Sequence, residues 1–339
     1  MAPMNRLRTP GAARWLAVAR QVGTVLLIAW FAWHTYARIS FFVDRQFPVG
    51  IDATIYYRGV VAWLQGGDPW DAAVFVGSFP YHYAGSPVTT VLMAPAGLMS
   101  EESFTRTWLI LTWIAAAWTV RRLGLPLWWL LFPPIGEALF SANPQIVVLA
   151  LLVANHSLAS ALATGLKVYA FIPLLGEGRW RQVALAVVIN AATILVAPDL
   201  WLDYFRQFGF ISERLHYESG EGLSAFYFPA LLAVTAVALV ILTLRDRRAA
   251  GWLAVPAVWP ATQFHYSTMA LPVMTPLLAV LLAFPMQHLP AIAITLEVGR
   301  RLIWPRLARL LPPETPSTAD NDGRLTAPAH GRTSAHSDD

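Results

Sequence analysis

The chain has 339 residues, of which 56% are hydrophobic and only 13% charged, with a net charge of +4 and no cysteine. Soluble domains carry roughly 25% charged residues, so the composition predicts an all-α polytopic membrane protein. The lack of cysteine excludes disulfides, thiolate catalysis, iron–sulfur clusters and cysteine zinc sites. The arginines stand in short clusters beside apolar runs, which indicates membrane orientation and no nucleic-acid partner.

The N-terminal segment 1–20 is basic without acidic residues, and an apolar run follows at 22–33. Basic residues before a membrane helix stay in the cytoplasm. No small-residue cleavage site follows the run, so we expect a retained first helix behind a cytoplasmic N-terminus. The next segment, which contains Asp52, then forms an extracytoplasmic first loop.

Asp52 stands at the start of a segment, 53–64, whose apolar residues recur near helical spacing. This spacing predicts a short helix at the membrane interface. Asp52 is then a candidate N-cap, because aspartate accepts hydrogen bonds from the amides of a first turn. It is equally a candidate general base, with Tyr56 one turn further along and Tyr57 beside it. Both roles are open at this point.

Closely spaced apolar segments follow a turn at 66–70. With the first helix they predict about ten crossings, in one transmembrane domain at 21–311. Segment 146–154 is too short to span a ~30 Å hydrocarbon core, so we expect half of a broken or re-entrant helix there. The segments are 87–99, 104–120, 125–140, 146–154, 158–175, 183–197, 225–244, 251–262 and 269–284.

Counting these crossings places the basic cluster 245–248 in the cytoplasm and the loop 199–222, with segment 263–267, outside beside Asp52. Arg121 and Arg122 also fall outside, against the positive-inside rule. Either the crossing count is off by one hairpin, or these arginines are held outside for a purpose such as binding a phosphate. At the other end, 289–311 predicts an interfacial helix against an anionic inner leaflet, and 312–339 a disordered cytoplasmic tail.

Ionisable side chains at membrane depth cost ~2.5–3.5 kcal/mol on insertion scales, which makes them functional candidates. Glu137 lies in GEALFSANPQ with the amides of Asn143 and Gln145. These three side chains either join helices at a break or contact a substrate.

Lys167 either snorkels to an interface or neutralises a phosphate. His265, in QFHYS, is either structural or part of a site on the same face as Asp52. The histidines lack metal-ligand spacing, so no metal is expected.

The order of these motifs resembles glycosyltransferase family 87, over roughly residues 15–285. These are C-type membrane glycosyltransferases, including polyprenyl-phosphomannose-dependent α-1,2-mannosyltransferases. The resemblance implies a helical bundle in which Asp52 is the base, His265 completes an outer pocket, and Lys167 matches the lysine before a proline segment. The motifs are Asp52-x-x-x-Tyr56-Tyr57, the turn 66–70, 83–95, Asn143-Pro144-Gln145, 167–173, Arg179-Trp180 and His265-Tyr266.

We therefore expect an inverting hexosyltransferase of the cell envelope, embedded in the plasma membrane with its site facing outside. It would move mannose from a polyprenyl-phosphate donor to a glycolipid or polysaccharide acceptor, among membrane lipids and without a cofactor. The alternatives are a transporter or lipid flippase without catalysis, and a non-catalytic partner in envelope assembly. The residues expected to bind substrate are Tyr56, Tyr57, Lys167, Arg121, Arg122, Asn143, Gln145, Glu137 and Tyr266.

Overall fold

A computed structural model describes residues 10–218, 223–260 and 262–310. The fold is mostly helical, apart from a two-stranded antiparallel hairpin, which confirms the all-α part of the prediction. The elements are α1 (Pro10–Asp44), α2 (Ile51–Leu64), η1 (Pro69–Asp71), β1 (Ala73–Val76), β2 (Phe79–His82), α3 (Pro87–Leu92), η2 (Ala94–Leu98), α4 (Glu101–Arg122), η3 (Leu127–Leu131), α5 (Pro133–Ser141), α6 (Pro144–Val153), α7 (Ser157–Leu166), η4 (Val168–Ala170), α8 (Phe171–Gly176), α9 (Trp180–Val196), α10 (Pro198–Glu218), α11 (Pro229–Arg245), α12 (Arg247–Val258), η5 (Phe264–Val273), α13 (Pro276–Leu282) and α14 (Leu289–Leu310).

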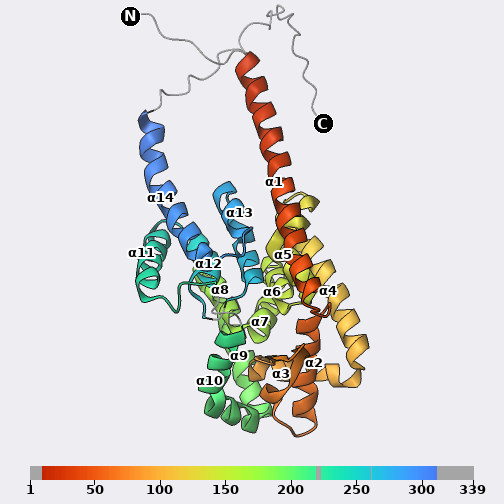
Figure 1. Ribbon diagram of the computed structural model, residues 1–339. Coiled ribbons are helices and arrows are strands. Elements are labelled where there is room, and N and C mark those ends of the chain that lie inside the picture. The colour runs from red at the N-terminus through yellow and green to blue at the C-terminus, as the bar shows by residue number, and fades with distance from the viewer. Residues whose placement is uncertain (1–9, 219–222, 261, 311–339) are drawn as a thin grey trace, which may run out of the picture.

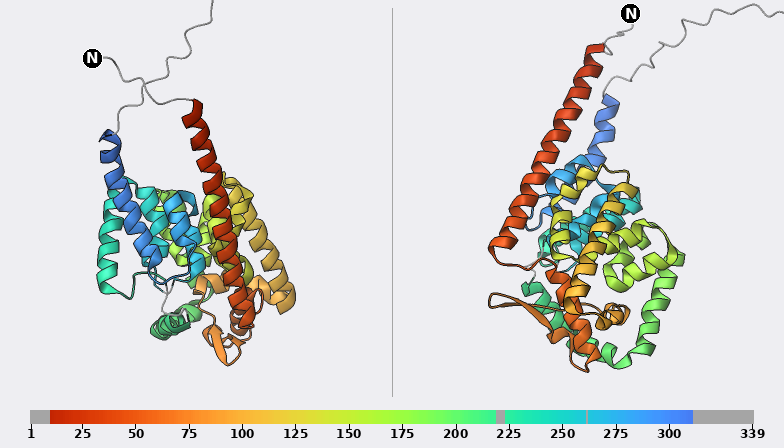
Figure 2. Two further views of the ribbon diagram at one scale, coloured as in Figure 1. Left: turned by 45° about the horizontal axis from the view of Figure 1, so that its top comes forward. Right: turned by 90° about the vertical axis from the view of Figure 1, so that its right-hand side faces the viewer.

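Helix α1 is the predicted first membrane helix, but it begins at Pro10 and so includes half of the expected N-terminal segment. Its part Ala17–Asp44 is long and apolar enough to cross a membrane. Only 6% of the apolar 18-residue stretch within this part is buried in the protein. Figures 1 and 2 show α1 along one side of the molecule, with its N-terminal half projecting beyond the compact body. A helix that is apolar and exposed on most sides suits a lipid environment.

The expected ten crossings are not reached. By length and composition, the described residues contain one helix that could cross a membrane, or up to three if two sharply bent pairs each form one span. These pairs are α5–α6, bent by 118°, and α9–α10, bent by 103°. Prolines in the first turns of α3, α5, α6, α11 and α13 divide the apolar segments, because proline favours a helix start and disrupts a helix interior.

Segment 87–99, expected as a crossing, folds as the short α3 and η2. This change affects where Arg121 and Arg122 lie. Helix α4 runs from α2 back along α1 (Figures 1 and 2), and η3, just after it, contacts the middle of α1 through the hydroxyl of Thr35, which donates to the carbonyl oxygen of Leu131 at 2.6 Å. The two arginines therefore end α4 away from α2 and Asp52.

Three other predictions concern the later segments. The broken helix at 146–154 is confirmed by the bend between α5 and α6. The expected outer loop 199–222 is instead mostly the long helix α10. The helix predicted at 289–311 is present as α14, whereas the tail 312–339 lies outside the described residues.

Helices α8 and α12 meet through two glycines. A Cβ atom added at Gly251 would lie 2.9 Å from the Cα of Gly176 and 3.1 Å from the carbonyl oxygen of Ile172. Both are backbone atoms, so relief requires the helices to separate rather than one side chain to turn. The close approach therefore requires glycine at this contact.

Gly251→Ala is expected to lower the free energy of unfolding by about 1–3 kcal/mol, the usual effect of overpacking. The measurement is the thermal unfolding midpoint of the purified protein in detergent. Gly299→Ala is the matched control, because a Cβ there meets open space and alanine favours a helix interior. Equal midpoints for Gly251→Ala and the wild type would contradict the close contact.

Candidate functional site

Asp52 lies in the first turn of α2 but does not cap it. The N-cap is Gly50, at a left-handed φ of 81°, and no side chain supplies a capping hydrogen bond. The predicted N-cap role of Asp52 is therefore wrong. As a negative side chain in the first turn, Asp52 still stabilises the helix through its dipole. Its carboxylate remains available for other contacts.

Asn143 fixes the direction of the Asp52 carboxylate. It caps α6 at the break with α5, where its Oδ1 accepts a hydrogen bond from the backbone N–H of Gln145 at 2.8 Å. This contact turns the Nδ2 group away from α6, and Nδ2 donates to Oδ2 of Asp52 at 2.8 Å. Ala142, just before the cap, takes a left-handed φ of 53° that makes the sharp turn possible. Asn143, expected to bind substrate, thus holds the candidate base.

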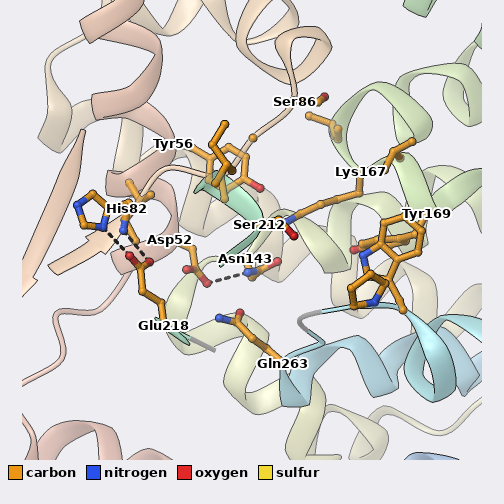
Figure 3. A pocket seen from close by; sticks show the side chains of 18 of the residues that line it. Asp52, Tyr56, His82, Ser86, Asn143, Lys167, Tyr169, Ser212, Glu218 and Gln263 are labelled. Atoms are coloured by element: carbon orange, nitrogen blue, oxygen red, sulfur yellow. Dashed lines mark hydrogen bonds and ion pairs between the residues drawn. The ribbon is translucent and has the colours of Figure 1, made fainter. Parts of the chain in front are cut away.

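Two cavities meet at Asp52. The first, of about 310 Å³, contains Lys167 and is called the lysine cavity here; the second, of about 360 Å³, contains His265 and is called the histidine cavity. Asp52 is in the lining of both, so the two predicted catalytic residues share a cavity. Figure 3 shows Asp52 between Glu218 and Asn143, with Lys167 reaching in from another side. The residues common to both linings are Asp52, Ile55, Tyr81, Glu218 and Gln263.

Lys167 connects α7 to η4 and points its ammonium group into the lysine cavity. Its Nζ lies 5.4 Å from the ring centre of Tyr56 and 5.8 Å from that of Tyr266. No carboxylate in the described residues forms an ion pair with it. Burial raises the pKa of the Tyr56 and Tyr266 phenols, so both stay protonated near neutral pH. The cavity therefore offers one positive charge and two hydroxyl groups to an anion.

His265 is 2% exposed and belongs to a buried polar chain that begins on α1. The Nε of Arg38 donates to Oε2 of Glu137 at 2.5 Å, and Oε1 of Glu137 lies 3.2 Å from Nδ1 of His265. A carboxylate paired with arginine accepts hydrogen bonds, so Nδ1 of His265 is the donor. Its Nε2 is buried and has no partner among the described residues. Buried polar atoms are normally satisfied, so this nitrogen is suited to a ligand or a water molecule.

Glu218 is a second carboxylate on the shared wall, and the sequence did not reveal it. The backbone N–H of His82 donates to Oε2 of Glu218 at 2.9 Å, and Nδ1 of His82 lies 2.5 Å from Oε1. Figure 3 shows the Glu218 and Asp52 side chains on the same side of the pocket. Glu218 ends α10, in the segment expected to be a loop. The aromatic residues of α10, at helical spacing, were the signal that could have predicted this helix.

Four predicted substrate-binding residues line neither cavity. The hydroxyl of Tyr57 donates to the carbonyl oxygen of Met99 at 2.8 Å, on another side of α2. Gln145 is fully buried in the protein interior. Arg121 and Arg122 are exposed at the end of α4. Of the three cations expected near a phosphate, the structure brings only Lys167 to Asp52.

Comparisons with known proteins add no functional information, because no family model, characterised protein or solved structure matches the chain. Within the described part of the chain, no group of three or more His, Asp or Glu side chains could hold a metal ion. Function therefore has to be argued from the chemistry of the site itself.

Proposed function

We propose that the protein is an integral membrane glycosyltransferase that moves a hexose, mannose by preference, from a polyprenyl-phosphate donor to a hydroxyl of a glycolipid or polysaccharide. The observation that carries the proposal is the position of Asp52. This carboxylate, oriented by Asn143, stands where two cavities meet. Among the described residues, the lysine of one cavity has no carboxylate partner and Nε2 of the histidine in the other has no hydrogen-bond partner. Such an arrangement suits a leaving phosphate and an attacking hydroxyl.

In the proposed reaction, Asp52 takes the proton of the acceptor hydroxyl as its oxygen bonds to the anomeric carbon. The bond between that carbon and the phosphate oxygen breaks, and the polyprenyl phosphate leaves with the electron pair. Lys167, Tyr56 and Tyr266 stabilise the charge that develops on the phosphate. Attack and departure take place on opposite sides of the carbon, so the configuration inverts.

The proposal gives one substrate to each cavity. The phosphate lies in the lysine cavity, where Lys167 is located, and the acceptor approaches Asp52 from the histidine cavity. Nδ1 of His265 donates to Glu137, so in the neutral form of the ring Nε2 is an acceptor. A sugar hydroxyl can donate to it. His265 and Glu137 therefore position the acceptor in this proposal rather than contact the phosphate.

In this proposal the site lies on the outer face of a multi-pass plasma-membrane protein. The segment 1–20 contains four arginines and no acidic residue, whereas Arg38 and Arg45, at the other end of α1, are accompanied by Asp44 and line the histidine cavity. The positive-inside rule favours the N-terminal end of α1 in the cytoplasm. Both cavities then open at the outer end of this helix, where lipid-linked donors of the cell envelope are used.

One experiment tests the proposal against its alternative, a transporter or lipid flippase, which the broken pair α5–α6 with buried Glu137 also suits. The purified protein in detergent is given radiolabelled polyprenyl-phosphomannose and an alkyl mannoside. A labelled disaccharide is expected, and none from GDP-mannose. A protein that forms no product in detergent, but moves the labelled lipid across vesicle membranes, would be a flippase.

A further inference from the structure

Helix α10 carries an exposed apolar stripe that the proposed reaction does not use. The stripe consists of Trp201, Leu202, Phe205 and Phe208, whose spacing places them along one side of the helix. Leu202 is 54% exposed, Phe205 65% and Phe208 53%. Large apolar residues gathered on one helix face in this way mark an interaction surface.

The opposite side of α10 is fixed to the loop that follows α2. Nε2 of Gln207 donates to Oδ2 of Asp68 at 2.7 Å, and Arg214 donates to the carbonyl oxygen of Trp70 at 2.5 Å. The exposed ring of Phe210, outside the stripe, has the guanidinium of Arg214 at 4.0 Å from its centre. These contacts set the rotation of the helix. The stripe therefore faces away from the loop at 68–71.

The position of α10 relative to α1 indicates what covers the stripe. Glu218 at the end of α10 and Arg45 just after α1 line the same cavity, so the two helix ends lie at one level. That level is the C-terminal end of α1, the helix that is long and apolar enough to cross a membrane. The C-terminal end of α10 is thus at the level of a membrane boundary rather than far from it.

Helix α9, which precedes α10, also carries exposed apolar residues. Its outward residues Val187, Val188, Leu195 and Val196 are 53% to 87% exposed, and the chain then bends by 103° into α10. The first residue of the stripe, Trp201, is joined to α9 by its indole N–H, which donates to the hydroxyl of Thr193 at 3.1 Å. Lipid can cover the exposed apolar residues of both helices, which favours a bilayer over a separate protein partner as the occupant.

Charge limits how deep α10 can lie. Asp199, Asp203, Arg206 and Glu213 flank the stripe, and a charged side chain at the bilayer centre is costly. We infer that α10 lies in the plane of the membrane interface, with the stripe of Trp201, Leu202, Phe205 and Phe208 in lipid and the charged flank at the headgroups.

Helix α10 also borders the lysine cavity. Phe208 belongs to the stripe and also lines the lysine cavity, together with Tyr204 of the same helix. The mouth of this cavity is therefore at the lipid surface, and a substrate with a lipid tail reaches Lys167 without crossing water. This placement of α10 stands whatever reaction the protein catalyses, because it depends on exposure and helix geometry alone.

The absence of cysteine makes a direct test possible. Phe205→Cys on the stripe and Arg206→Cys on the charged flank are each spin-labelled in the full chain, in nanodiscs of phosphatidylcholine and phosphatidylglycerol. The label at 205 is expected to be several-fold more accessible to oxygen, and several-fold less accessible to a water-soluble nickel chelate, than the label at 206. Val25→Cys on α1, 63% exposed, gives the reference for a lipid-facing site.

Equal nickel accessibility at 205 and 206 would place the stripe in water and overturn the inference. Strong dipolar broadening between labels at 205, absent from nanodiscs that hold a single copy, would make the stripe a contact between copies and would also overturn it. Leu202→Cys and Asp203→Cys repeat the comparison one turn earlier, in case a first variant does not fold. No substrate is present, so the outcome is separate from the test of glycosyl transfer.

Discussion

Asp52→Asn is expected to lower the rate of sugar transfer by about 10²- to 10⁴-fold, the usual contribution of a general base. The new amide has the shape of the carboxylate, and its oxygen can still accept the hydrogen bond from Asn143. What it loses is the ability to take a proton from the acceptor. The measurement is the initial rate of transfer from radiolabelled polyprenyl-phosphomannose in membranes that carry equal amounts of each variant.

Asp44→Asn is the matched control for this substitution. Asp44 is an exposed carboxylate at the end of α1, and it lines neither cavity. Its variant is expected to transfer at the wild-type rate. Equal rates for Asp52→Asn and the wild type would show that Asp52 is not the base, even if the protein is a glycosyltransferase.

The sequence predicted the parts of the site that depend on local spacing. The helix at 53–64 and the break near 146–154 follow from apolar periodicity and from proline and asparagine in succession. Tyr56 and Tyr57 show where this reasoning stops. Neighbouring residues point about 100° apart on a helix, so only one of them can face a given cavity. The sequence does not say which, and the structure selects Tyr56.

Predictions that depend on the number of crossings failed for a different reason. Composition shows that a segment is apolar, but not whether it is continuous enough to span. The segment 87–99 is as apolar as a crossing, yet it folds as two short helices, and Arg121 and Arg122 lie away from the site. Glu218 was missed because α10 carries too many charged residues to be recognised as an apolar segment.

Asn143 illustrates a third case, in which the residue type was predicted correctly and the role was not. An amide at a helix break was expected to bind substrate. Once its oxygen caps α6, its nitrogen has a fixed direction, and the nearest acceptor is the carboxylate of Asp52. The role follows from the angle between α5 and α6, which no local pattern specifies.

Lys167→Met is expected to have the second large effect, a loss of about 10²- to 10³-fold in the transfer rate at saturating donor. Methionine keeps an unbranched apolar stem beside Tyr56 and Tyr266 but removes the charge that the leaving phosphate requires. Lys167→Arg keeps the charge with a different shape, so we expect it to retain more activity than methionine. A structural role in packing would give the opposite order.

Lys167 is also the only lysine in the chain, which permits a second measurement on the unaltered protein. An amine-reactive label should modify this side chain, and mass spectrometry then locates the label at residue 167. Polyprenyl phosphate is expected to slow the modification, because the phosphate occupies the space around Nζ. The uncharged polyprenol is not expected to slow it. Equal protection by both lipids would mean that the tail shields the lysine and that the phosphate binds elsewhere. Asp52 would then act on a donor oriented differently from the one proposed here.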